Sequence, residues 1–418
     1  MSQAARQALH ARWSDIDAAA MRRGRRLKWT HHDGDVLPCW VAEMDFPIAD
    51  AIREALIEQI EVDGVGYPPL PIDPRLREAF VQRQQARYGW TVDPGAVYSL
   101  VNVLQGVDSQ ILLHSEPGEG VVLLTPIYGP FHQAVDGAGR LRIESRLVAR
   151  RSMDPSGAPA LHHEIDFDDL ERRLDSAPRP PRLLLLSHPH NPSGRVFTRA
   201  ELERLAELAE RFRLVVVSDE IWADLTLHRD EERSPHLPFA SLAPEIAART
   251  VTLSSATKAF NIAGLTVAVA VFGSPELKRR QRTLPPHLIG HSGPLDSAAA
   301  ITAWTDPRCE TWLGAARSYL RENRELALGL LAEELPAARA TTPEGSYLMW
   351  LDCRALELGE EPFDFFLREA RVAFSDGREF AARDDDAGRG HVRLNLATSA
   401  LLLEQILRRC GAAVRRRR

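Results

Sequence analysis

Short apolar runs alternate with amphipathic stretches along the chain between about residues 50 and 290. This alternation is typical of βα units that assemble into a mainly parallel sheet. The apolar runs are nearly continuous, which indicates strands with both faces covered. Between them, leucines and alanines at helical spacing follow Thr198, a residue type favoured at the N-cap, and predict a helix over 199–212. The predicted strands lie at residues 120–126, 182–189, 213–220, 249–255 and 267–273.

After about residue 290 the pattern changes to longer helices and separate strands, as in an α+β domain. The first 49 residues are expected to pack with this part, because the large sheet domain is complete without them. The sequence therefore predicts a large domain over 50–290 and a small α+β domain formed by 1–49 and 291–418. The elements predicted in the C-terminal part are helices over 310–335, 363–370 and 401–410 and strands over 346–354 and 391–398.

The bulk composition agrees with two domains of an ordinary globular protein. The chain has 418 residues, more than the roughly 250 to 300 at which one hydrophobic core stops growing. Hydrophobic residues make up 44% and charged residues 26%. The net charge of -6 comes from interspersed acidic and basic residues, so no basic face for nucleic acid is expected. The terminal run Arg415–Arg418 is interpreted as a solvated, frayed tail.

Targeting signals are not apparent in the sequence. The N-terminal stretch MSQAARQALHARWSDID carries charges and lacks the apolar core of a secretory signal. No window approaches the ~20 apolar residues that a membrane helix needs. A cytoplasmic protein without membrane, nucleic-acid or metal partners is therefore expected. The scattered cysteines form no CxxC pair and are expected to be reduced thiols: Cys39, Cys309, Cys353 and Cys410.

Three predicted strands are followed by a polar residue that could carry chemistry. Asn191, Asp219 and Lys258 come at the carboxyl ends of their strands, where open α/β sheets bind ligands. Each also has an ordinary structural interpretation, because Asn–Pro starts turns, aspartate caps helices and a loop lysine can simply be solvated. Lysine is rare in this chain: the 52 lysines and arginines include only Lys28, Lys258 and Lys278, and all others are arginine.

Together the three residue types suit pyridoxal phosphate, an aromatic aldehyde cofactor. A Schiff base needs a primary amine that can lose its proton, which lysine supplies and arginine does not. A carboxylate against the pyridine nitrogen stabilises its protonated form, and an amide can donate to the ring's phenolate oxygen. Lys258, Asp219 and Asn191 therefore predict this cofactor.

Eight motifs in a characteristic order strengthen this interpretation. They are LPCWVAEMDFP, GYPPLP, SEPGEGVVLLTPIYGPF, SHPHNPSGRVFT, VVSDEIWADL, SSATKAFNIAGL, PEGSYLMWLD and VRLNLATS. With them, nearly the whole chain resembles the fold-type-I pyridoxal-phosphate enzymes of the class I/II aminotransferase superfamily, and within it the MalY/PatB-type cystathionine β-lyases. The resemblance implies an aspartate-aminotransferase-like α/β fold, with a mostly parallel seven-stranded sheet covered by helices, and a homodimer with shared active sites.

The resemblance also implies a role for each site residue. Lys258 forms the Schiff base, Asp219 pairs with the pyridine nitrogen and Asn191 contacts the phenolate oxygen. The other implied contacts are a ring stack from Tyr128, a cofactor contact from Trp222, phosphate contacts from the backbone of Asn102, Val103 and Leu104, from the Ser255 hydroxyl and from Tyr67 across the dimer, and a clamp on the substrate α-carboxylate from Arg393.

Two departures from the superfamily favour a lyase. Many aminotransferases have tyrosine at the position of Trp222, and arginine at the position of Thr266, eight residues after the lysine. The differences point toward α,β-elimination of cystathionine or another cysteine S-conjugate to a thiol, pyruvate and ammonia, with the amine of Lys258 removing the α proton. Glu43 stands where the family usually has aspartate, and Asn102 where it often has glycine.

Two other functions fit the same residues. One is an aminotransferase, or a decarboxylating or oxidatively deaminating enzyme of secondary metabolism, because one scaffold supports many reactions. The other, of a different class, is a regulatory protein that binds the cofactor as a sensor. The leaving group stays open, and residues 28–45 and 283–295 are expected to supply the loops that select it. Other notable residues are interpreted as flanking a turn (His188, His190), as surface or lid residues (His31, His32) and as packing residues (Trp40, Trp350).

Overall fold

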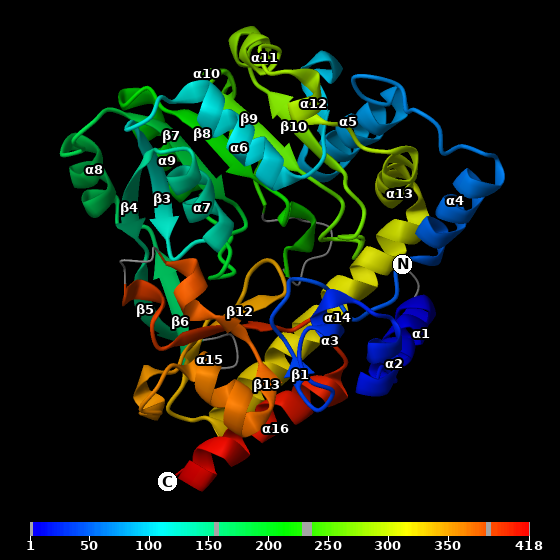
Figure 1. Cartoon of the computed structure of the whole chain (residues 1–418), viewed down its shortest axis with the longest axis vertical. Coiled ribbons are helices and arrows are strands. Elements are labelled where there is room, and N and C mark those ends of the chain that lie inside the picture. The colour runs from blue at the N-terminus through cyan, green and yellow to red at the C-terminus, as the bar shows by residue number, and fades with distance from the viewer. Residues whose placement is uncertain (1–2, 154–158, 228–235, 382–385, 418) are drawn as a thin grey trace.

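The computed structural model describes residues 3–153, 159–227, 236–381 and 386–417, and a seven-stranded sheet forms the centre of its larger part (Figure 1). The strand order is β2–β10–β9–β8–β7–β3–β4. β10 is antiparallel to both of its neighbours, and all the other pairs are parallel. The strands span Val97–Leu100 (β2), Gly120–Thr125 (β3), Leu141–Arg146 (β4), Pro181–Ser187 (β7), Val215–Asp219 (β8), Thr250–Ser254 (β9) and Ala268–Phe272 (β10).

Helices cover both faces of this sheet, as the continuous apolar strands predict. Alternate residues of β3 and β7 belong to different hydrophobic cores: Val122 and Leu184 lie in one, Val121 and Leu183 in the other. Because both faces are buried, the strands show no alternation of polar residues in the sequence. The facing side chains come from α8 (Phe167–Asp175) and α9 (Arg199–Arg211) in the first core and from α6 (Val103–His114) and α7 (Gly129–Gly137) in the second.

All five strands predicted in this region are confirmed, and Thr198 caps α9 through a reciprocal capping box with Glu201. The pattern missed β2, β4 and the hairpin of β5 (Val148–Met153) and β6 (Pro159–Glu164). β4 lies at one edge of the sheet and leaves alternate residues at least partly exposed, so its sequence LRIESR has no long apolar run. β2 has only four residues, too few for a clear pattern.

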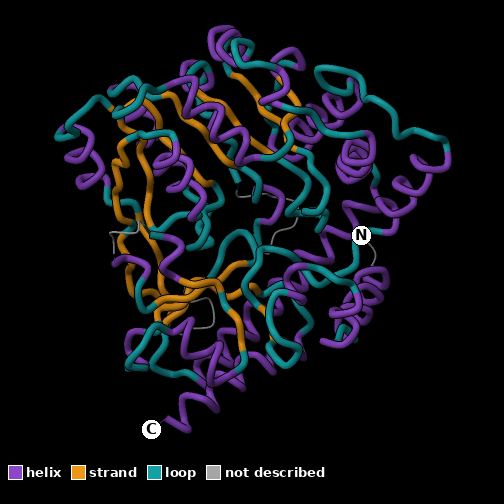
Figure 2. Tube along the Cα trace, in the orientation of Figure 1, coloured by secondary structure: helices purple, strands orange, loops and turns teal. Residues whose placement is uncertain are grey.

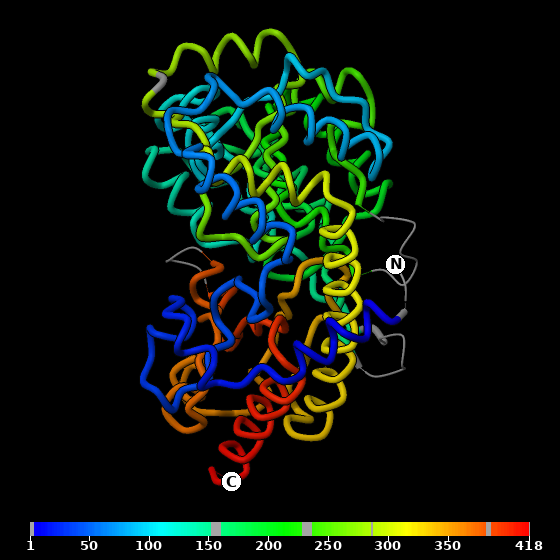
Figure 3. Tube along the Cα trace, turned by 90° about the vertical axis from the view of Figure 1, so that its right-hand side faces the viewer, coloured from blue at the N-terminus to red at the C-terminus, as the bar shows by residue number. Residues whose placement is uncertain are grey.

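The C-terminal part of the chain forms a second, smaller sheet beside long helices. Figure 3 shows α14 running from the side of the large sheet down to this smaller part. The strands are β11 (Arg339–Ala340), β12 (Leu348–Asp352), β14 (Ser375–Asp376) and β15 (His391–Asn395), in the antiparallel order β11–β12–β15–β14. The helices are α14 (Pro307–Glu334), α15 (Pro362–Phe365), followed by a π-helical turn (Phe366–Ala370), and α16 (Ala400–Arg417).

The N-terminal residues lie against this smaller part. β1 (Leu37–Pro38) pairs in parallel with β13 (Val372–Ala373), and α1 (Gln3–Ser14) packs against α14. α13 packs against α4 and α5. The remaining helices are α2 (Ala18–Arg23), α3 (Leu27–Thr30), α4 (Asp50–Glu61), α5 (Pro74–Tyr88), α10 (Pro244–Ala247), α11 (Pro275–Gln281), α12 (Pro286–Ile289) and α13 (Pro294–Thr305).

The C-terminal arginines differ from the prediction of a frayed tail. α16 continues through Arg417, so that prediction is wrong up to this residue, and the final arginine lies outside the described ranges. Arg415 Nη1 lies 2.7 Å from Glu334 Oε2, and the Arg417 guanidinium lies over the Phe365 ring. Cations at a helix C-terminus also interact favourably with the helix dipole. These contacts explain why a run of like charge stays helical.

Neither a membrane-spanning helix nor a disulfide is present in the described part of the chain. Each helix there is too short or too polar to cross a lipid bilayer. All four cysteines are buried free thiols. Burial raises the pKa of Cys39 and Cys353, which disfavours the reactive thiolate.

Candidate active site

Asn191, Asp219 and Lys258 come together at the carboxyl ends of three neighbouring strands, β7, β8 and β9. They line one cavity of about 240 Å³. Figure 2 shows that loops occupy the region between the two groups of strands. The same cavity is lined by six other residues predicted for the site: Asn102, Val103, Leu104, Tyr128, Trp222 and Ser255.

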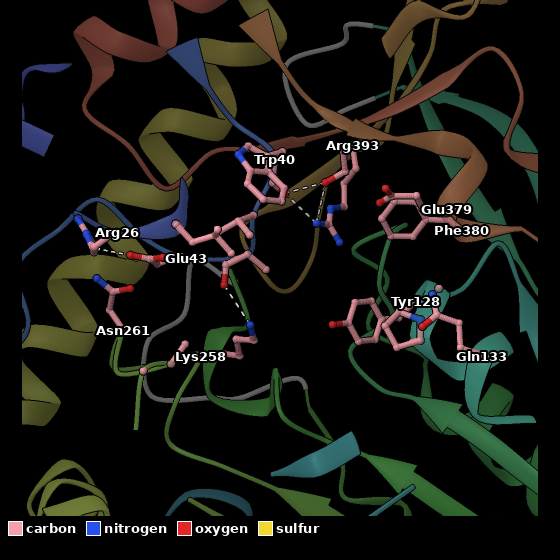
Figure 4. A pocket seen from close by; sticks show the side chains of 18 of the residues that line it. Arg26, Trp40, Glu43, Tyr128, Gln133, Lys258, Asn261, Glu379, Phe380 and Arg393 are labelled. Carbon is pink, nitrogen blue, oxygen red and sulfur yellow. Dashed lines mark hydrogen bonds and ion pairs between the residues drawn. The ribbon is translucent and has the colours of Figure 1, made fainter. Parts of the chain in front are cut away.

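A second, larger cavity of about 1170 Å³ adjoins the first. Tyr128 and Lys258 line both cavities, and Arg393 lines the larger one. Figure 4 shows these three side chains around the same space. Tyr67 lines neither cavity and is 99% exposed. All but one of the predicted site residues therefore gather around the two cavities.

The Lys258 side chain is mostly buried and is held by a backbone carbonyl. Its Nζ donates a hydrogen bond of 3.1 Å to Ala42 O and lies 5.7 Å from the centroid of the Trp222 ring. Burial and the charge of Arg393 lower the pKa of Lys258 to about 8, although Asp219 acts in the opposite direction. The interpretation as a solvated loop lysine is therefore wrong, and part of the amine is uncharged just above neutral pH.

The Asp219 carboxylate is buried with little hydrogen-bonding support. In the described part of the chain it accepts one hydrogen bond, from Ile221 N at 3.0 Å. Burial raises the pKa of Asp219 to about 7; Glu220 adds to this increase, whereas the Ile221 N–H and Lys258 oppose it. A cation against the carboxylate would restore its ionised form. Asp219 therefore fits the protonated ring nitrogen of the predicted cofactor.

Arg393 fixes the orientation of the Asn191 amide. Its Nη1 donates a hydrogen bond to Asn191 Oδ1 over 3.1 Å. Because the amide oxygen is thereby used as an acceptor, the NH₂ group of Asn191 remains available as a donor at the cavity wall. This polarity fits the phenolate oxygen of pyridoxal phosphate.

Arg393 itself is a buried cation without a carboxylate partner among the described residues. Its Nη2 donates to Trp40 O at 2.9 Å and to Ser375 Oγ at 2.8 Å, and its buried Nε has no acceptor there. The guanidinium carbon lies 4.7 Å from the centroid of the Phe380 ring. Burial lowers the pKa of Arg393 to about 10, which leaves it charged at neutral pH. A buried guanidinium with neutral partners is suited to binding an anion.

The smaller cavity also meets the N-terminus of α6. Asn102 is the N-cap of this helix, and its Oδ1 accepts a hydrogen bond from Gln105 N at 2.8 Å. The N–H groups of Val103 and Leu104 are among the first amides of the helix, which have no intrahelical acceptor and can bind a phosphate. None of the described residues that line this cavity is an arginine.

Hydroxyl groups near the lysine add to this lining. Ser255 Oγ donates a hydrogen bond to Val267 O at 2.6 Å and lies 2.8 Å from Thr257 Oγ1. Because Val267 O accepts the only hydroxyl proton of Ser255, Thr257 is the donor in the Ser255–Thr257 hydrogen bond, and either hydroxyl would have to exchange its present acceptor to donate to a ligand. Thr257 lines the cavity but was missed by the sequence reasoning, although its place beside Lys258 is a signal.

Thr266 lines the same cavity and is bound to an anionic side chain. Its N–H and hydroxyl groups both donate to the Asp296 carboxylate, at 3.0 and 3.3 Å. The position at which many aminotransferases carry an arginine is therefore occupied by a neutral residue paired with a carboxylate.

Backbone carbonyls of residues 40–46 form the wall beside the lysine. Ala42 O, the acceptor of the lysine amine, also accepts a hydrogen bond from Tyr347 OH at 2.9 Å. Asn395 Nδ2 donates to two more carbonyls of this segment, at 2.6 and 2.7 Å. The sequence reasoning missed both side chains. Asn395 could have been found from its place two residues after Arg393 on one strand, because residues i and i+2 share a face.

Ion pairs hold the same segment from the N-terminal side. Lys28 Nζ lies 2.9 Å from Asp45 Oδ2, and both side chains are fully buried. Trp29 Nε1 donates to the other oxygen of Asp45 at 2.7 Å. Glu43 Oε1 lies 2.7 Å from Arg26 Nη1, and both residues line the larger cavity. Glu43, which stands where the family usually has aspartate, thus forms an ion pair with Arg26.

The other histidines and tryptophans noted in the sequence pack against aromatic rings. Trp40 lines the larger cavity, whereas Trp350 is buried. Ring contacts join His188 to His236, His190 to Phe197, Trp350 to His391, and both His31 and His32 to Trp40.

Two loops were expected to select the leaving group. Residues of the segment 28–45 line the larger cavity, whereas the segment 283–295 lines neither cavity.

Comparison with known proteins gives matches over most of the chain. Residues 41–409 match the family described as aminotransferase class I and II. The cystathionine β-lyase PatB of Bacillus subtilis is 35% identical over 383 residues, which cover 91% of this chain and 93% of that protein. The crystal structure of OvoB has a TM-score of 0.84 at 33% identity and covers 96% of this chain and 98% of its own. Cystalysin from Treponema denticola, described as containing a pyridoxal 5′-phosphate cofactor, has a TM-score of 0.84 at 26% identity and covers 94% of this chain and 96% of its own.

Proposed function

The chain belongs to the aminotransferase class I and II family, whose cofactor is pyridoxal 5′-phosphate, and we propose that it is a carbon–sulfur β-lyase. In the proposed reaction a cysteine thioether and one water give a thiol, pyruvate and ammonia. The observation that carries the proposal is the likeness to a cystathionine β-lyase over 91% of the chain. The aspartate-aminotransferase-like fold by itself supports several reactions.

The residues around the smaller cavity are proposed to hold the cofactor. Bound pyridoxal phosphate supplies an aldehyde for the amine and an electron-withdrawing ring for the electron pair left at Cα. Lys258 would provide the amine, and the Asp219 carboxylate would pair with the ring nitrogen. The NH₂ group of Asn191 would donate to the ring oxygen, and the first amides of α6 would bind the phosphate.

Arg393 is proposed to bind the α-carboxylate of the substrate. Its charge is buried with no carboxylate at ion-pair distance among the described residues, and its Nε has no acceptor there. A carboxylate that accepts two hydrogen bonds from one guanidinium is fixed in orientation as well as position. This contact would orient the Cα–H bond toward Lys258.

Lys258 is proposed to act as the base that removes the α proton. With its pKa lowered to about 8, a useful fraction of the amine is neutral near physiological pH, and the remainder can return a proton. Ala42 O accepts a hydrogen bond from Nζ and fixes the direction of the side chain.

The pairing of Thr266 with Asp296 supports elimination over transamination. A phosphate near this position would lack the guanidinium found in many aminotransferases. Incubation of the purified holoenzyme with L-cystathionine is expected to release a thiol and pyruvate, whereas incubation with an amino donor and a keto acid is expected to give little exchange. Efficient exchange without thiol release would assign the chain to the aminotransferases instead.

We also propose a cytoplasmic homodimer with shared active sites. Tyr67 is 99% exposed, and the nearby Val65 and Leu70 are 58% and 65% exposed. Such an apolar stretch is suited to contact with a second copy. Sedimentation of wild type and a Val65→Asp/Leu70→Asp variant tests this: the wild type should sediment as a dimer and the variant should dissociate. A monomeric wild type would refute the proposal.

A further inference from the structure

Most charged side chains that line the larger cavity are already neutralised by a partner. Arg26 lies 2.7 Å from Glu43, and Arg142 lies 3.0 Å from Asp136. Arg378 is likewise paired, with Asp376 and with Asp364. Among the described residues that line this cavity, the cations with no carboxylate within ion-pair distance are Lys258 and Arg393, which the proposed reaction uses for the cofactor and the α-carboxylate.

Glu379 is the exception among the carboxylates. It lines the larger cavity, is accessible to solvent and forms no ion pair or side-chain hydrogen bond in the described part of the chain. The other lining carboxylates, Glu43, Asp45 and Asp136, each have a basic partner within 3.0 Å. Partial burial and the charge of Asp376 raise the pKa of Glu379, although the charges of Arg393 and Arg378 oppose the rise, so a further cation at closer range would favour its ionised form.

The backbone of Glu379 is fixed against the turn that carries Tyr128. Glu379 belongs to the 3₁₀ turn Gly377–Phe380, and Ile127 N donates a hydrogen bond to Phe380 O at 2.9 Å. The carbonyl of Glu379 packs closely against Gly129. Figure 4 shows Glu379 beside Phe380, across the cavity from Lys258. These two contacts fix the backbone of Glu379 at one wall of the cavity.

We propose that Glu379 determines specificity by favouring a cysteine thioether whose leaving half carries a cation such as a primary ammonium. This inference rests on the proposed lyase function. A leaving half that ends in a carboxylate finds no unpaired cation among the described lining residues beyond those already used. A cationic end can reach the carboxylate of Glu379 and complete the charge pairing of the cavity.

The test compares three substrates of similar length. They are S-(2-aminoethyl)-L-cysteine, the uncharged S-propyl-L-cysteine and S-carboxymethyl-L-cysteine, with kcat/KM measured by pyruvate release. The wild-type holoenzyme should prefer the aminoethyl over the propyl substrate by about fivefold, as expected for one solvent-accessible ion pair, and should use the carboxymethyl substrate least. Glu379→Gln should remove the preference, Glu379→Asp should keep part of it, and the remote Glu207→Gln should leave it unchanged.

A binding measurement separates this inference from the proposed reaction. L-Lysine and L-2-aminoheptanoic acid have the shapes of the first two substrates but carry no leaving thiol, so calorimetry reports binding alone. Tighter binding of L-lysine that disappears in Glu379→Gln supports the charge preference even if no thioether is cleaved, and absence of cleavage would then count against the lyase alone. Equal ratios in wild type and Glu379→Gln, in both assays, would overturn the role of Glu379.

Discussion

Arg393 Nη1 donates a hydrogen bond to Asn191 Oδ1 over 3.1 Å and so connects strand β15 of the small sheet with the turn after β7 of the large one. One guanidinium thereby orients the amide proposed to contact the cofactor and remains charged for the substrate. Because the two roles share one side chain, changes at Arg393 are expected to affect substrate binding first and the cofactor environment second.

Arg393→Lys should therefore raise KM for a cysteine thioether by about 10- to 100-fold, since lysine cannot form the two parallel hydrogen bonds of a guanidinium. Steady-state assays of pyruvate release measure this change. Arg378→Lys, at an exposed arginine that lines the same cavity, is the matched control and should change KM by less than about threefold. Similar KM values for Arg393→Lys and wild type would count against the carboxylate site.

Asp219 should make the stability of the cofactor-free protein depend on pH. Its pKa is about 7 in the folded chain and 3.8 in the unfolded chain, so the folded state binds more protons between these values. The free energy of unfolding contributed by this group therefore falls as the pH rises from about 4 to 7. Asp219→Asn should remove this loss and be more stable than wild type at pH 8 by about 2 kcal/mol or more.

Urea unfolding of the cofactor-free proteins at pH 5 and pH 8 measures the difference. The exposed Asp175→Asn is the control and should show no comparable pH dependence. A constant difference between wild type and Asp219→Asn at the two pH values would contradict the raised pKa.

The buried ion pair of Lys28 and Asp45 should be essential for stability. Lys28→Met leaves the buried Asp45 charge with only the more distant Arg26, at 4.0 Å, and should lower the free energy of unfolding by about 3 to 5 kcal/mol. The double variant Lys28→Met/Asp45→Leu should recover part of this loss, because no unpaired charge remains. Lys278→Met, at a partly buried lysine without a carboxylate partner in the described part of the chain, should cost less than about 1 kcal/mol. Equal effects of the two single lysine changes would show that burial of the pair is unimportant.

Gly129 should not tolerate a side chain. A Cβ atom at this position would collide with the carbonyl of Glu379, whereas one at Gly137, in the same helix α7, would meet no atom within 4 Å. Gly129→Ala is expected to cost about 1 to 3 kcal/mol and to lower lyase activity by displacing Tyr128. Gly137→Ala is expected to be neutral or slightly stabilising. Thermal unfolding and pyruvate assays of both variants provide the measurements, and a fully active, stable Gly129→Ala would disprove the close contact.

Much of the fold and the centre of the site could be predicted because their determinants are local in the sequence. The inner strands are buried on both faces and read as apolar runs, and Asn191, Asp219 and Lys258 follow such runs directly. The edge strand β4 escaped prediction because half of its residues face solvent. The role proposed for Lys258 could be predicted from its chemistry, since arginine could not replace it.

The wall of the site could not be predicted, because it depends on contacts between distant parts of the chain. The acceptor of the Lys258 amine is the backbone carbonyl of Ala42. Because every residue type has such a carbonyl, the sequence does not indicate this contact. The pairing of Glu43 with Arg26 and the packing of Glu379 against Gly129 likewise follow from tertiary geometry. A contact of Tyr67 with a second copy belongs to the assembly of two chains, and the sequence motifs imply that assembly only through the family resemblance.

The hydrogen bonds from Asn395 to the carbonyls of Val41 and Glu43 join residues 354 and 352 positions apart. During synthesis, the segment beside Lys258 therefore emerges long before the strand that fixes it. The nascent chain can form the large sheet early, but the wall of the site closes only when nearly the whole protein has been made. A chain that stops short of β15 would keep its lysine and its strands and still lack both the wall and the arginine that the substrate requires.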